Sequence, residues 1–218
     1  MPRAPAGARS LLQTMGYHTM NAKFTVLLAG LFGLVGMAQA TDLNYDYVEV
    51  GYAEVDFDDV DEDLTGVYIR GSFLLAEQIY LFGGYADGET DSFNAFDGRG
   101  RLESTGYTLG VGYRYGVGNQ TDFTFGAAFE RAEIEGKGGL SFLGSDSENG
   151  YSLSVGLRHL VTPQVELGAN VAYVDIGDDD TILTLGGLFH ITELVAVGLA
   201  YFVGSDADGF EGGVRFKF

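Results

Sequence analysis

Apolar residues alternate with small or polar residues along most of the chain, and this period of two constrains the fold more than any other feature. In 165–173 (VELGANVAY), the odd-numbered positions hold Val, Leu, Ala, Val and Tyr, and the even-numbered positions hold Glu, Gly, Asn and Ala. The same alternation recurs in 107–115, 151–158 and 210–218. A period of two is that of a β-strand with one apolar face. The pattern therefore predicts an all-β fold.

Turn signals divide the alternating regions into ten expected strands. These are 44–57, 64–75, 78–89, 102–115, 122–135, 147–159, 164–176, 181–191, 194–204 and 209–218. One set of connections is short and weakly charged, at 76–78, 116–120, 160–163 and 192–193. The other set is acidic and often longer, at 56–63, 87–100, 135–149, 177–180 and 204–209. Short turns at one end and longer loops at the other are typical of an antiparallel up-and-down transmembrane β-barrel.

The polarity of the two strand faces predicts which one meets lipid. One face carries large apolar residues and the other carries Gly, Ser, Thr and charge, which suits a narrow interior, so we expect the apolar face to point outward. An even number of strands places both termini on the periplasmic side and leaves no sheet edge unpaired in the membrane. Aromatic residues are expected to form two interfacial girdles. The girdle near the acidic loops comprises Tyr52, Tyr85, Tyr107, Phe129, Tyr151, Tyr173 and Phe210, and that near the short turns comprises Phe73, Tyr113, Tyr115, Phe123, Phe189 and Phe218.

The first forty residues differ from the rest and predict a secretory leader. Their only charged residues are three basic ones, and an apolar run at 24–37 is followed by Ala38, Gln39 and Ala40, an A-x-A cleavage pattern. We interpret 1–40 as the signal peptide region, cut after Ala40, with 1–19 an upstream-start artefact. Residues 41–218 are then the barrel domain.

The charge and cysteine content restrict the partners and the chemistry. Without the leader, nine Lys and Arg residues stand against 31 Asp and Glu residues, a net charge of −22. Such an acidic surface argues against nucleic acid or anionic lipid as a direct partner, because both would be repelled without bridging cations. The absence of cysteine removes disulfides, thiol catalysis and thiolate metal ligands. The 34 glycines include many within strands, where we expect them to give larger neighbours room.

With its leader, its strand repeats such as YTLGVGYRYG (107–116) and its ending GGVRFKF (212–218), the chain resembles the small outer-membrane β-barrel proteins of Gram-negative bacteria, the OmpA-like and OmpX-like barrels. The resemblance covers 41–218 and implies an outer-membrane location among lipid and lipopolysaccharide. It also implies that the assembly machinery recognises a C-terminal aromatic, here Phe218, with Phe216 and Val214 on the same face. The best-known members have eight strands, which makes eight the alternative to ten. Nothing follows Phe218 in this sequence, so no peptidoglycan-binding domain is expected.

The alternation also assigns charged residues to the inward face. Isolated charges in a narrow interior are costly, so we expect them to pair across the lumen and largely plug it. They are Glu49, Arg70, Arg114, Glu130, Arg158, Glu166, Glu211 and Arg215.

The acidic loops offer weak association with divalent cations shared with lipopolysaccharide phosphates. Their spacing does not match an EF-hand, and solvated loops are the favoured interpretation, so we expect no dedicated metal site and no cofactor. The carboxylates concerned include Asp58, Asp59, Asp61, Asp178, Asp179, Asp180, Asp206 and Asp208.

Three functions compete at this point. The first is a structural or surface-interacting barrel that acts through its acidic extracellular loops, where the apolar residues Phe93, Phe96, Leu140, Phe142 and Leu143 are expected to be exposed. The second is a narrow passive pore. The third, an outer-membrane hydrolase, is disfavoured because His159 and His190, the only histidines after the leader, fall near the short turns, away from the outer rim. We therefore expect no enzymatic activity.

Overall fold

The computed structural model describes residues 43–57, 60–95, 98–141 and 144–218, and the expected leader lies outside them. The described residues form eleven strands. They are β1 (Tyr47–Phe57), β2 (Val60–Ala76), β3 (Ile79–Thr90), β4 (Phe93–Ala95), β5 (Gly98–Val117), β6 (Thr121–Gly138), β7 (Ser145–Thr162), β8 (Val165–Ile176), β9 (Asp178–His190), β10 (Val195–Val203) and β11 (Ala207–Lys217). Within this part of the chain, no helix is long and apolar enough to cross a membrane.

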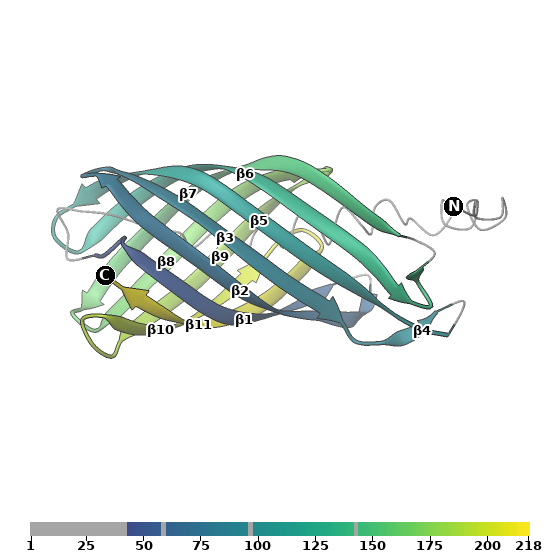
Figure 1. Cartoon of the computed structure of the whole chain (residues 1–218). Coiled ribbons are helices and arrows are strands. Elements are labelled where there is room, and N and C mark those ends of the chain that lie inside the picture. The colour runs from purple at the N-terminus through teal and green to yellow at the C-terminus, as the bar shows by residue number, and fades with distance from the viewer. Residues whose placement is uncertain (1–42, 58–59, 96–97, 142–143) are drawn as a thin grey trace.

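Ten of these strands form a closed antiparallel barrel, which confirms the predicted count over the alternative of eight. Each strand pairs with the next along the chain, β1 pairs with β11, and β3 pairs directly with β5. The remaining strand, β4, is a three-residue segment paired with the start of β5. The strands tilt steeply around the barrel (Figure 1). Closure satisfies the backbone hydrogen bonds of every barrel strand, the condition for crossing hydrocarbon.

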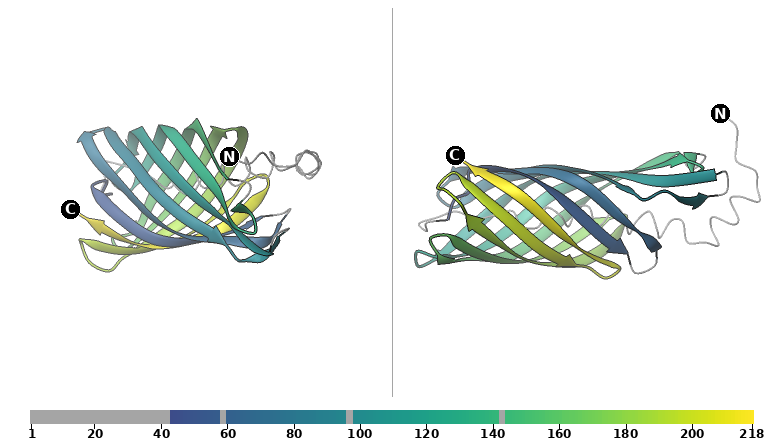
Figure 2. Two further views of the ribbon diagram at one scale, coloured as in Figure 1. Left: turned by 45° about the vertical axis from the view of Figure 1, so that its right-hand side comes forward. Right: turned by 90° about the horizontal axis from the view of Figure 1, so that it is seen from below.

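Several strands, among them β2, β5, β6 and β7, are longer than predicted at the acidic end, and the strands differ in length around the barrel. β5 has 20 residues, and β6 and β7 have 18 each, whereas β10 has 9 and β11 has 11. Segments expected as loops at 87–100 and 135–149 are therefore partly strand. The wall containing β4, β5 and β6 extends farther at one end than the walls of β1 and β11 (Figure 2).

The outward face is apolar in the middle of each strand, as predicted. Large hydrophobic side chains such as Leu109, Val111 and Val155 are about half exposed or more, as expected of groups that face lipid. Towards the acidic loops the polarity of the two faces inverts. On β1, Glu54 and Asp56 point outward while Ala53, Val55 and Phe57 are buried inside. Above the aromatic row the barrel is thus built like a water-soluble one.

Strand glycines make room for large inward side chains. A Cβ atom added to Gly112 would lie 1.9 Å from Cζ of Tyr80, and one added to Gly51 would lie 2.3 Å from Cζ of Tyr68. Tyr80 and Tyr68 are both buried. The narrow interior accommodates these rings because the facing positions carry no side chain.

Candidate functional site

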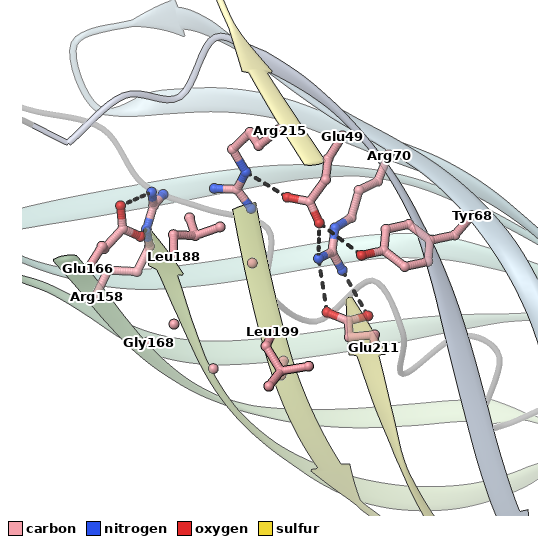
Figure 3. Close-up of a pocket in the computed structure, with 14 residues that line it drawn as sticks. Glu49, Tyr68, Arg70, Arg158, Glu166, Gly168, Leu188, Leu199, Glu211 and Arg215 are labelled. Carbon is pink, nitrogen blue, oxygen red and sulfur yellow. Dashed lines mark hydrogen bonds and ion pairs between the residues drawn. The ribbon is translucent and has the colours of Figure 1, made fainter. Parts of the chain in front are cut away.

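The middle of the lumen holds a closed network of two arginines and two glutamates. The register of β1 places Glu49 directly opposite Arg70 of β2 on one side and Arg215 of β11 on the other. Arg215 Nε donates to Glu49 Oε2 at 2.7 Å, and Arg70 Nη2 donates to the other oxygen of Glu49. Arg70 also donates to both carboxylate oxygens of Glu211, at 3.2 and 2.9 Å. Each of these side chains is 4% exposed or less (Figure 3).

Aromatic rings complete this network. The Tyr68 hydroxyl donates to Glu49 Oε1 at 3.0 Å, and the Tyr68 ring faces the Arg70 guanidinium at 4.7 Å. The Arg215 guanidinium lies 3.9 Å from the centre of the Tyr47 ring. Ion pairs removed from water are retained only when geometry and additional hydrogen bonds compensate for lost hydration. The fork of Arg70 across two carboxylates provides that compensation.

A second ion pair lies nearer the short turns. Arg158 of β7 donates to both oxygens of Glu166 of β8, with the Nη2–Oε2 contact at 2.8 Å. His190 Nε2 lies 3.4 Å from Glu166 Oε2, and Lys217 Nζ lies 3.3 Å from His190 Nδ1. The other histidine, His159, contacts Thr121 instead. The two histidines thus have separate partners.

The third charged group involves two residues that sequence reasoning missed. Arg114 lies 3.5 Å from Asp122, and its Nε donates to the Glu77 carbonyl oxygen. The Tyr45 hydroxyl donates to Asp122 at 3.3 Å. The Tyr45 ring lies 5.4 Å from the Arg114 guanidinium and 5.3 Å from that of Arg158. Tyr45 precedes β1 but continues its inward parity, and Asp122 has the inward parity of β6, so alternation could have identified both residues.

Glu130 departs from the expectation that inward charges pair with opposite charges. Its oxygens accept hydrogen bonds from the hydroxyls of Thr108 and Ser152, the latter at 2.6 Å. The register explains this arrangement because Glu130 lies opposite Thr108 on β5 and Gly150 on β7, so no arginine faces it across either strand pair. Hydroxyl donors satisfy a buried carboxylate without neutralising it.

Apolar clusters lie on both sides of the central network, and the Arg114–Asp122 group lies beside the second of them. The first lies at the acidic-loop end and includes Phe57, Leu102, Ile134, Ile176 and Phe202. Leu140, expected to be exposed in a loop, is buried in this cluster, so that expectation is wrong. Its carbonyl oxygen and side chain lie against the Gly136 backbone. The side chain of Phe93 and residues 96, 142 and 143 lie outside what the structure describes.

The second apolar cluster lies near the short turns and contains part of the segment that precedes β1. Leu43 and Tyr45 pack there with Tyr80, Phe82 and Leu160. The Asp46 side chain accepts a hydrogen bond from the Leu74 backbone at 2.7 Å, which ties the segment to β2. The interior is therefore filled at three levels, two apolar and one charged.

Little space remains between these levels. A cavity of about 30 Å³ lies beside the central network, where Gly168, Gly186 and Gly198 provide a wall without side chains. Figure 3 shows the charged side chains that line it. A water molecule needs roughly 10–15 Å³ of such volume, so this cavity holds about two water molecules rather than a solute.

The loop carboxylates have local partners where the structure describes them. Asp180 accepts hydrogen bonds from Ser205, with the hydroxyl at 2.6 Å, and Asp208 accepts one from Tyr201 at 2.9 Å. Asp178 and Asp179 are the first two residues of β9, and Asp206 immediately precedes β11. Asp61 lies in β2. Asp58 and Asp59 lie outside the described residues. In the described ranges, no three or more His, Asp or Glu side chains gather as a metal site.

The C-terminal residues of interest lie together on the outward face of β11. Phe216 and Phe218 are 49% and 66% exposed, and Val214 has the same parity. The Phe218 backbone donates to the Asp46 carbonyl oxygen at 3.0 Å, next to the pairing of Tyr47 with Lys217. The end of the last barrel strand is thus joined to the start of the first.

Comparisons with known proteins agree with this architecture. The profile of the family described as outer membrane protein beta-barrel domain matches residues 24–189, more than half of the chain. No curated protein matches. Similar solved structures include Ail, the attachment invasion locus protein of Yersinia pestis, with 16% identity over 78% of this chain and 97% of that chain and a TM-score of 0.42. The NanC porin has 9% identity over 78% of this chain and 100% of that chain, with a TM-score of 0.49. OprG from Pseudomonas aeruginosa has 14% identity over 84% of this chain and 99% of that chain, with a TM-score of 0.42.

Proposed function

Because this chain belongs to the outer membrane protein beta-barrel domain family, we propose that it is a sealed barrel that acts through its surface rather than through its lumen. It resides in the bacterial outer membrane and is surrounded there by lipid and lipopolysaccharide. The observation that carries the proposal is the filling of the interior at three levels. An open pore needs a continuous hydrated path, whereas two apolar clusters and the Glu49–Arg70–Arg215 network lie across this one.

The proposed orientation places the acidic loops outside the cell and both ends of the barrel domain on the periplasmic side. Its support is the asymmetry of the connections, because outer-membrane barrels have short periplasmic turns and longer extracellular loops. The two-residue turn Glu77–Gln78 and the extended ends of β5 and β6 illustrate the contrast. The outward position of Val214, Phe216 and Phe218 leaves these three side chains accessible. This accessibility supports their proposed role in recognition by the assembly machinery.

The proposed role is structural or interactive, through a rim rich in carboxylates. Outward acidic residues such as Glu54, Asp56 and Asp179 keep this rim hydrated and carry weak, shared divalent cations. The second candidate, a narrow passive pore, has the water-sized cavity in its favour. It requires the central network and both apolar clusters to move apart, and we place it second for that reason. Among the described residues, no cluster of three or more His, Asp or Glu side chains supports a metal-dependent hydrolase.

Single cysteines test this orientation without interference, because the chain has no cysteine. With a membrane-impermeant maleimide, Ser145→Cys at the acidic end should react in intact cells. Gln120→Cys in a short turn should react only after the outer membrane is opened. Thr184→Cys, inside the barrel and 3% exposed in the wild-type chain, should react only after unfolding. Labelling of Gln120→Cys but not Ser145→Cys in intact cells would reverse the orientation and refute the proposed surface role.

A further inference from the structure

The basic side chains outside the lumen gather on one wall of the barrel. Of the nine Lys and Arg residues after position 40, five lie in the lumen or at the short-turn end, namely Arg70, Arg114, Arg158, Arg215 and Lys217. The other four lie on the outward face of the neighbouring strands β5 and β6. We call this group, Arg99, Arg101, Arg131 and Lys137, the basic wall.

The basic wall begins where the lipid-facing belt ends. Tyr85, Tyr107 and Arg131 lie side by side on β3, β5 and β6, so Arg131 stands at the level of the aromatic row. Arg101 lies opposite Lys137 and is six residues farther along β5 than Tyr107, about 20 Å at 3.3 Å per residue. The wall therefore covers the depth at which lipid phosphates and sugars lie next to a barrel.

The current partners of these cations are exchangeable. Arg101 contacts Glu103 at 2.8 Å and Glu89 at 3.2 Å, and Lys137 contacts Glu135 at 2.6 Å and Glu103 at 3.3 Å. These side chains are 33–55% exposed. Exposed ion pairs contribute little to stability, so a phosphate can replace a carboxylate at small cost, and it offers arginine a bidentate geometry.

The groups of the wall keep their charges at neutral pH. Hydrogen bonding from Arg101 lowers the pKa of Glu103, and hydrogen bonding to Glu135 raises the pKa of Lys137. Neutral polar side chains lie beside the cations as well and accept hydrogen bonds from Arg131. Arg131 contacts Asn149 and Ser147 of β7, each at 3.2 Å, and contacts Glu133 in addition. Amide and hydroxyl groups of this kind are suited to sugar oxygens.

The other walls lack such cations at the same level. Outward positions there carry Glu54 and Asp56 on β1, Asp175 on β8 and Asp179 on β9, and the sequence places no Lys or Arg in the acidic loops beside them. These carboxylates repel a phosphorylated surface, whereas on the basic wall four cations offset the neighbouring carboxylates Glu89, Glu103, Glu133 and Glu135. An anionic glycolipid therefore has one favourable side of the barrel to approach.

From this charge complementarity we infer that the basic wall is a binding site for the phosphate groups of the lipopolysaccharide glycolipid in the outer leaflet. The guanidinium groups of Arg101 and Arg131 and the ammonium group of Lys137 contact phosphate oxygens directly, in place of the carboxylates that they contact now. In the cell, this inference rests on the outward orientation given under the proposed function.

Lipid binding by the full chain, extracted from outer membranes into detergent, tests the inference directly. The probe is bisphosphorylated lipid A, compared with the same lipid lacking both phosphates, and bound lipid is counted by native mass spectrometry. We expect the phosphorylated form to bind at least about tenfold more tightly, as hydrogen bonds between charged groups imply. The triple variant R101Q/R131Q/K137Q should lose that preference, whereas R101K/R131K/K137R, which keeps the charges, should retain most of it.

Three results would overturn the inference. If the phosphate-free lipid bound as tightly as the phosphorylated form, the protein would contact the acyl chains only. Wild-type binding by the glutamine triple variant would exclude the basic wall. If EDTA abolished binding in every variant, divalent cations bridging the lipid phosphates to carboxylates would hold the lipid, and the basic wall would not. Heat-modifiable gel migration verifies that each variant is folded. Lipid binding measured in detergent does not depend on the orientation of the protein in cells. A negative result in the lipid-binding experiment therefore leaves the cysteine-labelling result valid, and a negative labelling result leaves the lipid-binding result valid.

Discussion

Replacing Arg70 with methionine is expected to lower the free energy of unfolding by about 3–5 kcal/mol, the cost of removing one partner from a buried ion pair. Arg70 is the only group seen to contact both Glu49 and Glu211 among the described residues. Its loss leaves the carboxylate of Glu211 without the donor that holds both of its oxygens. Two acidic groups would then lie close together in the interior, where Glu49 would keep its contacts with Arg215 and Tyr68 and Glu211 would lose its arginine.

Urea titration of the protein in lipid vesicles, followed by heat-modifiable gel migration, measures this loss. Arg101→Met provides the matched control, because Arg101 forms comparable pairs on the exposed outer wall and should cost less than about 1 kcal/mol. Adding Glu49→Gln and Glu211→Gln to the Arg70 variant should recover part of the stability, since the unpaired charges are removed. If Arg70→Met and Arg101→Met were equally stable, the central network would not hold the barrel together.

The second large effect concerns the lipid-facing belt. Val111→Arg is expected to destabilise the folded barrel by about 2–4 kcal/mol, the cost of a cation near the bilayer midplane. Val111 is 48% exposed and lies on β5 between Tyr107 of one girdle and Tyr115 of the other. No carboxylate lies directly across from it, because its partners are Leu81 and Ala127.

Thr105→Arg, on the same strand and the same face, is the control for this change. Thr105 lies one step above Tyr107, opposite Asp87 and Glu133, so an arginine there should cost no more than about 1 kcal/mol. The difference between the two variants in vesicle unfolding therefore reports where the hydrocarbon ends. Equal costs at both positions would mean that β5 does not cross the bilayer at this level.

The period of two was sufficient to predict the barrel, its ten strands and the outward apolar face. It was insufficient at the acidic ends because alternation continues there while the polarity of the two faces exchanges. The acidic run that begins at Asp56 predicted a loop at 56–63, yet β1 continues to Phe57 and β2 already begins at Val60. Polarity alone does not reveal how far a strand continues beyond the membrane. That length is fixed by pairing with neighbours, such as Arg101 with Lys137.

The inward charges illustrate a different limit. Alternation placed Glu49, Arg70 and Arg215 on the same face, and cross-strand register then determined that they meet. Register depends on turn geometry and bulges, such as the shift between Leu74 and Ala76, which periodicity does not encode. Tyr45 has the inward parity of the expected strand 44–57, but its position between two guanidinium groups is a product of tertiary packing that alternation does not encode.

Single-channel conductance of the purified chain in planar bilayers tests the sealed lumen most directly. We predict no reproducible current steps in 1 M KCl at moderate voltage, because the apolar clusters and the central network lie across the lumen and the cavity beside the network holds about two water molecules. A larger hollow of about 500 Å³ lies at the short-turn end, beside Tyr45, Leu74 and Arg114. Regular steps that change when Arg114 or Arg158 is neutralised would contradict this account. They would instead establish a narrow pore through the charged interior.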